Sequence, residues 1–196
     1  LSGCNNTAIG YITLAAISTA SNATAVGYSA LAANTAANNT AVGSGSLQLN
    51  TSGTQNTALG YNSLTTTLIG VGCTAVGFNA LALSTGSSNT AVGSAALDTL
   101  SSGTQCTAIG TNALNAQTTA SNATAIGYNA LAANTAANST AVGSGALAAN
   151  TSGTSNTAVG YNALTTCITG TNNTAVGLNA LTLSTGTANT AFGTNA

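Results

Sequence analysis

The chain of 196 residues has no Lys, Arg, His, Pro, Met or Trp, and Asp98 is its single acidic residue. Common acid–base and nucleophilic enzyme sites need a histidine, a lysine or a carboxylate pair, and charge-based binding of nucleic acid needs cations. No run of roughly 18 apolar residues is present. We therefore expect no enzyme activity, no cofactor, no metal, no nucleic-acid partner and no membrane insertion.

A tetrapeptide of Thr, Ala, an apolar residue and Gly recurs along the chain at intervals of 16 or 17 residues. A short fixed period is typical of one supersecondary unit stacked on itself. We predict an all-β fold, a parallel β-solenoid of about 12 coils with 16–17 residues per coil, which forms one continuous domain over residues 1–196. The repeat threonines are Thr7, Thr24, Thr40, Thr57, Thr74, Thr90, Thr107, Thr124, Thr140, Thr157, Thr174 and Thr190.

The two halves of the chain, residues 1–96 and 101–196, resemble each other closely, so we infer an internal duplication. Both ends fall within a repeat, and we expect the sequence to be an excerpt of a longer chain. Glycine, asparagine and serine dominate the segments between repeats, which we interpret as turns.

We number the residues of each coil from its threonine. The sequence predicts a strand at positions 1 to 4 and a second strand at positions 8 to 12, as in residues 47–51. Position 3 is apolar throughout and position 8 is leucine, so we expect both to face the core. By alternation position 1 also faces inward, while positions 2 and 4 face outward and Asp98, at position 9, lies in solvent. The predicted core comprises Thr24, Val26, Leu31, Thr40, Val42, Leu47, Thr57, Leu59, Leu64, Thr140, Val142, Leu147, Thr157, Val159 and Leu164.

Positions 2 and 4 are alanine and glycine in every coil. Because an exposed strand tolerates larger side chains, we interpret these columns as a face against which another backbone packs, in the same chain or in a neighbouring copy. The predicted assembly face comprises Ala25, Gly27, Ala41, Gly43, Ala58, Gly60, Ala75, Gly77, Ala91, Gly93, Ala108, Gly110, Ala125, Gly127, Ala141, Gly143, Ala158, Gly160, Ala175 and Gly177.

Three further columns follow from the repeat. Asparagines precede most repeat threonines, and stacked amides can hydrogen-bond along such a column. Aromatic residues such as Tyr61 and Phe78 recur at position 5, where we interpret them as wedges over the strand corner or as a stacking ladder for sugar rings. Cys73 and Cys106 share one column but lie two coils apart, about 10 Å, beyond disulfide reach. We expect each cysteine, including Cys4 and Cys167, to be a small buried residue, with an interchain bridge or metal site as the alternative.

The nonapeptide Asn-Thr-Ala-Val-Gly-Tyr-Asn-Ala-Leu at 156–164, with Asn-Thr-Ser-Gly at 150–153, resembles the repeats of bacterial and phage tail-fibre-like proteins. More distantly, it resembles the head repeats of trimeric autotransporter adhesins. This resemblance implies a left-handed β-roll in which three chains associate. The adhesin coil is shorter and its second motif is less rich in leucine.

Three functions remain open at this point. The first, favoured by inward valines, is a structural fibre or filament segment of a surface adhesin or phage-type fibre, assembled from copies of itself as a trimer or filament. It would be extracellular, at a cell or virion surface. The second is an ice-binding (antifreeze) solenoid, which requires Thr and Val to face outward around a thin Ala and Gly core. The third is a carbohydrate-binding repeat surface whose partner is a cell-surface glycan.

Overall fold

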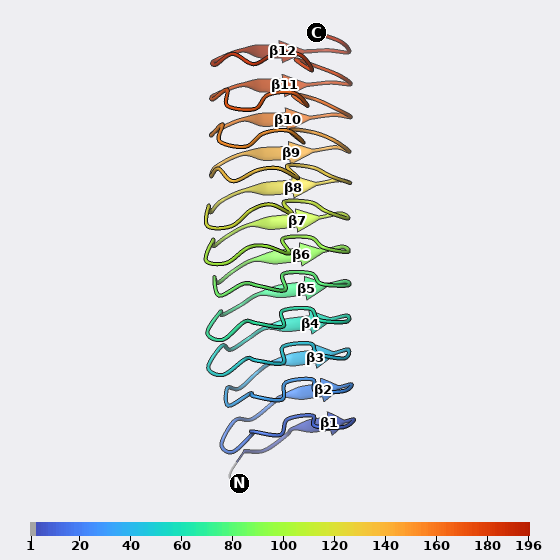
Figure 1. Ribbon diagram of the computed structural model, residues 1–196, viewed down its shortest axis with the longest axis vertical. Coiled ribbons are helices and arrows are strands. Elements are labelled where there is room, and N and C mark those ends of the chain that lie inside the picture. Colours follow the sequence, from blue (N-terminus) through green and yellow to red (C-terminus); the bar gives the residue numbers. More distant parts are fainter. Residues whose placement is uncertain (1–2) are drawn as a thin grey trace.

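The computed structural model describes residues 3–196. Residues 1 and 2, which belong to the expected 1–196 domain and to its first duplicated half, lie outside this range. Twelve strands stack in sequence order into one parallel sheet (Figure 1). The prediction of an all-β parallel β-solenoid is confirmed. The strands are β1 (Thr7–Ile9), β2 (Thr24–Val26), β3 (Thr40–Val42), β4 (Thr57–Leu59), β5 (Thr74–Val76), β6 (Thr90–Val92), β7 (Thr107–Ile109), β8 (Thr124–Ile126), β9 (Thr140–Val142), β10 (Thr157–Val159), β11 (Thr174–Val176) and β12 (Thr190–Phe192).

The register is the same between all neighbouring strands: threonine pairs with threonine, alanine with alanine, and the apolar third residue with its equivalent. At about 4.8 Å per strand, the eleven intervals make a sheet about 53 Å long. Backbone bonds between coils continue outside the strands. Leu47 donates its N–H to the carbonyl of Ser63 (3.0 Å), and Leu49 donates to that of Thr65 (3.0 Å). Each coil is therefore fixed to the next along much of its path.

The strand side chains point in the opposite direction to the prediction. In β9, Ala141 is fully buried, whereas Thr140 and Val142 are partly exposed. Every strand from β2 to β11 has the same buried alanine between two more exposed residues. The core prediction was wrong for Thr24, Val26, Thr40, Val42, Thr57, Leu59, Thr140, Val142, Thr157 and Val159, and correct for Leu31, Leu47, Leu64, Leu147 and Leu164.

The predicted assembly face is accordingly wrong. Its alanines line the interior and have no exposed area: Ala25, Ala41, Ala58, Ala75, Ala91, Ala108, Ala125, Ala141, Ala158 and Ala175. Its glycines end the strands at φ values of 130–138°, which favour glycine: Gly27, Gly43, Gly60, Gly77, Gly93, Gly110, Gly127, Gly143, Gly160 and Gly177. A Cβ atom on Gly143 would lie 2.4 Å from the carbonyl oxygen of Gly160. The next coil of the same chain, and not a neighbouring copy, therefore excludes a side chain there.

The second predicted strand is absent within the described coils, and this explains the inversion. Positions 5 to 10 form a turn, in which Leu47, at position 8, has a φ of 49°. Position 6 is also left-handed in most coils, as at Asn62 (φ 52°). These two reversals bring positions 7 and 8 to the interior together, so that Ala146 and Leu147 are both fully buried. The alternation of a strand therefore cannot be extended back from the leucine. With leucine entering from the opposite wall, only a methyl group fits beneath the sheet.

Buried amides form the predicted asparagine column. Asn39 donates its Nδ2–H to the carbonyl of Gly53 in the next coil (2.7 Å), and its Oδ1 accepts the backbone N–H of Asn56 (2.9 Å). Near the C-terminal end, Asn173 and Asn156 also bond side chain to side chain (3.1 Å). A buried amide without partners would be costly, so these bonds allow a narrow core to contain polar residues.

The difference between coils of 16 and 17 residues lies at one corner, away from the sheet. In a 16-residue coil, Asn34 donates to the carbonyl two residues later, at Ala36 (2.8 Å). In the following 17-residue coil, Asn50 donates to the carbonyl three residues later, at Gly53 (3.0 Å). The additional residue is therefore accommodated between this amide and that carbonyl, and the strand register is not changed.

Three cysteines fill interior columns, and all four are free. Cys73 occupies an asparagine position and its Sγ donates to the carbonyl of Gly86 (3.2 Å), while Cys106 makes the equivalent contact with Ala120 (3.5 Å). The expectation of buried cysteines is confirmed for Cys73, Cys106 and Cys167 but is wrong for Cys4, which is exposed.

The observed orientation of the side chains predicts that aspartate lowers stability much more at residue 141 than at residue 142. Ala141→Asp places an unpaired charge in the dry interior, and we expect it to lower the unfolding free energy by several kcal/mol or to prevent folding. Val142→Asp, on the partly exposed outer side, should cost about 1 kcal/mol or less. Thermal unfolding followed by circular dichroism compares the two variants. A greater loss of stability for Val142→Asp would contradict the orientation described above.

A second prediction concerns the interruption of the asparagine column at Cys73. Cys73→Asn supplies an Nδ2–H for the carbonyl of Gly86 and an Oδ1 for the backbone N–H of Asn89. We expect this variant to raise the unfolding free energy by about 0.5–1.5 kcal/mol, the net value of one added hydrogen bond. Cys4→Asn is the matched control, since Cys4 is exposed and should change stability little. Equal effects of the two substitutions in chemical denaturation would argue against the column as a source of stability.

Candidate functional site

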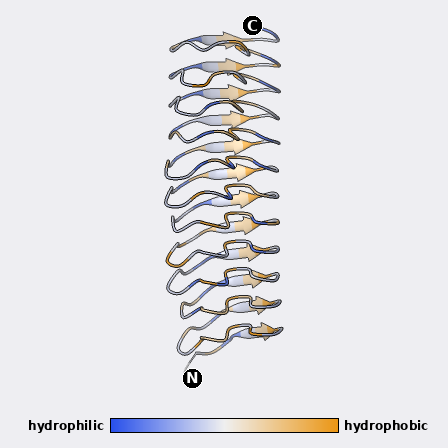
Figure 2. Ribbon diagram, viewed as in Figure 1, coloured by the Kyte–Doolittle hydropathy of each residue, from blue (hydrophilic) through white to orange (hydrophobic). Residues whose placement is uncertain are grey.

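The outer side of the sheet carries two parallel rows of side chains, which we name the Thr/Val face. One row contains the twelve position-1 threonines and the other contains the position-3 apolar residues. Exposure in the apolar row ranges up to 59% at Ile9 and 69% at Phe192. Figure 2 shows the pattern as a repeated change along each strand, from hydrophilic at its start to hydrophobic at its end.

The threonine hydroxyls of this face make no hydrogen bonds to the protein within the described residues. Other threonines in the chain do bond internally: Thr51 donates to the carbonyl of Leu68 (2.8 Å), and Thr85 donates to that of Ser101 (2.7 Å). Because the repeat keeps threonine at position 1 in every coil while nothing inside the protein uses its hydroxyl, this row of donors and acceptors is free to bind something outside.

The backbone fixes the spacing of the two rows. Equivalent residues of adjacent strands lie about 4.8 Å apart, and positions 1 and 3 of one strand lie about 6.7 Å apart on the same side. The in-register ladder repeats this spacing along all twelve strands. The result is a regular array of hydroxyl and methyl groups on a surface without charge.

An aromatic column borders the apolar row at position 5. Tyr11 stacks on Tyr28 with ring centroids 5.7 Å apart, and Tyr61 stacks on Phe78 at 5.6 Å. Each of these rings is more than half exposed. They therefore lie on the surface as short stacks, which leaves their faces and edges accessible.

A ladder of exposed amides borders the threonine row on the other side, near the N-terminal end. Asn5 donates to Asn22 (3.3 Å) and Asn22 donates to Asn38 (3.1 Å), with Nδ2 as donor and Oδ1 as acceptor. These residues have φ values of 59–62°, a conformation that asparagine tolerates better than most residues. The Thr/Val face is thus flanked by amides on one side and rings on the other.

The buried cysteines and Asp98 do not belong to this face, whereas the tyrosines border it. Burial raises the pKa of the Cys73, Cys106 and Cys167 thiols, which keeps them protonated and weakly nucleophilic. Asp98 is half-buried between the coils of Ala82 and Asn115, and desolvation raises the pKa of its carboxyl group. Asp98 was predicted to lie in solvent, and its side chain is only partly exposed.

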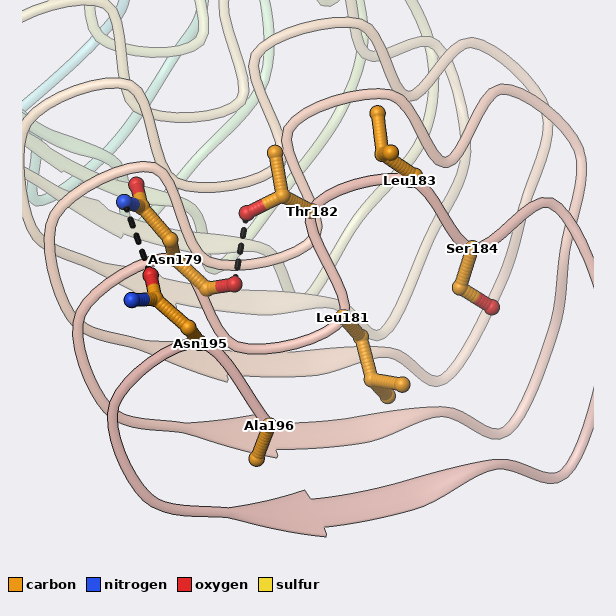
Figure 3. A pocket seen from close by; sticks show the side chains of 7 residues that line it. All are labelled: Asn179, Leu181, Thr182, Leu183, Ser184, Asn195 and Ala196. Carbon is orange, nitrogen blue, oxygen red and sulfur yellow. Dashed lines mark hydrogen bonds between the residues drawn. The ribbon is translucent and has the colours of Figure 1, made fainter.

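A hollow lies at the C-terminal end of the solenoid, where coil 12 reaches Ala196 (Figure 3). Leu181, Thr182 and Asn195 line it, and Asn179 bonds to Asn195 side chain to side chain (3.2 Å). It contains no ionisable side chain. Among residues 3–196, no helix is long and apolar enough to cross a membrane, and no three potential metal ligands come together.

No protein family, curated protein or solved structure matches the chain. The residues that sequence reasoning misplaced are the outward threonines and their apolar neighbours. A signal for them was present: position 3 varies from valine to phenylalanine, which a thin interior could not accommodate, whereas position 2 is always alanine.

The raised pKa of Asp98 predicts how stability depends on pH. A carboxyl group with a higher pKa in the folded state stabilises the fold below its unfolded value of about 4, and this contribution is lost as pH rises through the folded value. We therefore expect the protein to become less stable as pH rises from about 3 toward neutrality. Asp98→Asn should remove this dependence while leaving that of the termini. Melting temperatures of both proteins across this range make the comparison, and parallel curves would contradict the prediction.

Proposed function

We propose that this protein binds ice through the Thr/Val face. The observation that carries the proposal is the row of twelve outward threonines, in register and without internal hydrogen bonds, beside a row of apolar side chains. A crystal of water presents regularly spaced hydrogen-bonding sites. A surface that matches them must therefore offer hydroxyl groups at fixed intervals, and the sheet does this.

The spacing of the array supports this proposal. The interval of about 4.8 Å between strands is set by backbone hydrogen bonds, and it lies close to the short axial repeat of hexagonal ice. The methyl groups of threonine and valine favour an ordered first layer of water around them, while the hydroxyls can anchor that layer. Repetition along the sheet allows many weak contacts to act together.

The absence of charge on the chain, apart from Asp98, also supports ice binding. Charged side chains hold water in orientations that do not fit a lattice. The backbone bonds between coils and the buried amide columns hold the face rigid, so little conformational entropy is lost when it meets a solid surface. Such a protein would act outside the cell, where ice grows, and we propose an extracellular location.

A structural fibre remains the second candidate, now with the Thr/Val face as the contact between copies. The exposed apolar row is one observation that favours it, because a continuous apolar strip marks many association surfaces. Burial of the strip in a trimer or filament would, however, remove twelve hydroxyls from water, and each would need a new partner. Ice satisfies these hydroxyls directly, which is why we favour it. The resemblance to tail-fibre and adhesin repeats stays a prediction.

Two central threonines provide the test of ice binding. We expect the unaltered protein to show thermal hysteresis and to be incorporated into a growing ice crystal. Thr107→Lys combined with Thr124→Lys places two hydrated charges in the middle of the array, and we expect it to abolish most of the hysteresis. Thr118→Lys combined with Thr119→Lys is the control, because these exposed residues lie on the corner away from the sheet and add the same charge.

Three outcomes would count against ice binding: no hysteresis in the unaltered protein, equal loss in both double variants, or a stable oligomer that the Thr107→Lys, Thr124→Lys variant dissociates. Light scattering at the working concentration detects the last of these and would support the fibre instead. Circular dichroism of both variants establishes that they fold.

A further inference from the structure

The aromatic column at position 5 is interrupted by serine at regular intervals. Tyr28 is followed by Ser44 and then by Tyr61, and the same order recurs as Tyr128, Ser144 and Tyr161. In adjacent coils the rings of this column stack at 5.6–5.7 Å with interplanar angles of 9–21°. At Ser44 and Ser144, the neighbouring coil on each side has a tyrosine in this column.

The width of this interval corresponds to one ring. Two coils separate Tyr28 from Tyr61, a distance of about 9.6 Å, so a ring placed midway would lie about 4.8 Å from each tyrosine. Such distances fall within the range of about 4.5–7 Å at which rings stack favourably. We name these intervals the ring slots: Tyr28, Ser44 and Tyr61 form the first, and Tyr128, Ser144 and Tyr161 form the second.

The floor of each slot is formed by backbone and by one amide group. Glycine follows the serine, at Gly45 and Gly145, and a Cβ atom there would lie 2.3 and 2.2 Å from the Oδ1 of Asn62 and Asn162 in the next coil. The carbonyl of Gly45 accepts a hydrogen bond from the hydroxyl of Thr65 (3.2 Å), and the carbonyl of Gly145 accepts one from Thr165 (3.2 Å). The same backbone contact thus supports both slots. The four tyrosines are 52–57% exposed, so their ring faces are accessible.

We propose that each ring slot binds the terminal pyranose ring of a neutral glycan, held between two tyrosine faces. A sugar ring has C–H groups on its faces, which suit an aromatic platform, and hydroxyl groups around its edge. The serine hydroxyl at the base and the two tyrosine hydroxyls can bond to that edge. No charged side chain lies on the chain apart from Asp98, which favours an uncharged ligand.

This proposal concerns a surface beside the Thr/Val face and does not rest on ice binding. It also differs from a continuous aromatic ladder, because the binding element is the gap and not the number of rings. A ladder would gain affinity from additional aromatic residues, whereas a slot would lose its ligand if the gap were filled.

Filling both slots provides the test. Ser44→Tyr combined with Ser144→Tyr inserts the residue that the same column has in other coils, so the variant should fold as the parent does. We would titrate both proteins with methyl β-D-galactopyranoside and methyl β-D-glucopyranoside and follow the tyrosine ring signals by NMR. For the parent, signals of Tyr28, Tyr61, Tyr128 and Tyr161 should shift and those of Tyr11 should not.

In the filled variant, we expect the dissociation constant to rise about tenfold or more, the effect of losing two ring contacts. Ser94→Tyr is the matched control, since Ser94 has Phe78 on one side but Thr111 on the other and forms no slot. Its tyrosine shifts should match those of the parent. No binding of either glycoside to the parent would overturn the proposal, as would unchanged or tighter binding to the filled variant. Thermal hysteresis, measured on the same samples, should not depend on this substitution.

Discussion

The narrow space beneath the sheet determines the rest of this structure. Each coil closes within 16 or 17 residues and stacks directly on the next, so a leucine entering from the opposite wall leaves room for a single methyl group under the strand. Alanine is the residue that fits. Once alanine faces inward, the pleat of the strand turns threonine and its apolar partner outward. Close packing of this kind tolerates no larger side chain without displacement of the backbone.

The sequence predicts the period and the first strand of each coil correctly, because a repeated Thr-Ala-apolar-Gly segment stacks on its own copies in register, but it wrongly predicts a second strand at positions 8 to 12. It does not reveal the direction of the side chains so readily. The prediction placed Val142 and Leu147 in the core because both columns are apolar in every coil. Only the leucine lies there.

The chain between Val142 and Leu147 is not extended, since Gly143, Gly145 and Leu147 have φ values of 134°, 70° and 51°. Leucine is rare in that conformation, so no propensity would have suggested it. The more reliable indicator was the range of residues at each position. Position 3 accepts valine, isoleucine, leucine and phenylalanine, a range of volumes that solvent can accommodate, whereas position 2 accepts alanine alone. The range of side-chain sizes at position 3 was therefore the sequence signal for the candidate site. The common assumption that valine lies in the core led to the wrong prediction.

The polar residues of the chain serve two different purposes according to their column. Inside, asparagine and cysteine donate hydrogen bonds to carbonyl groups of the neighbouring coil, as at Asn39 and Cys73. The buried Oδ1 atoms of Asn50 and Asn150 accept none within the described residues. Outside, the threonines of the sheet keep their hydroxyls free. Uncharged polar side chains therefore hold adjacent coils together in the interior and leave hydroxyl groups free on the Thr/Val face.

One corner of the coil accommodates one residue more or fewer, so the length of the repeat can change there. Asn34 and Asn50 make equivalent contacts with different numbers of residues between donor and acceptor. Length variation is thereby confined to a corner that lies outside the strands. Loops, labels or attachment peptides grafted at this corner should leave the sheet intact, because the grafting site and the Thr/Val face belong to different parts of the coil.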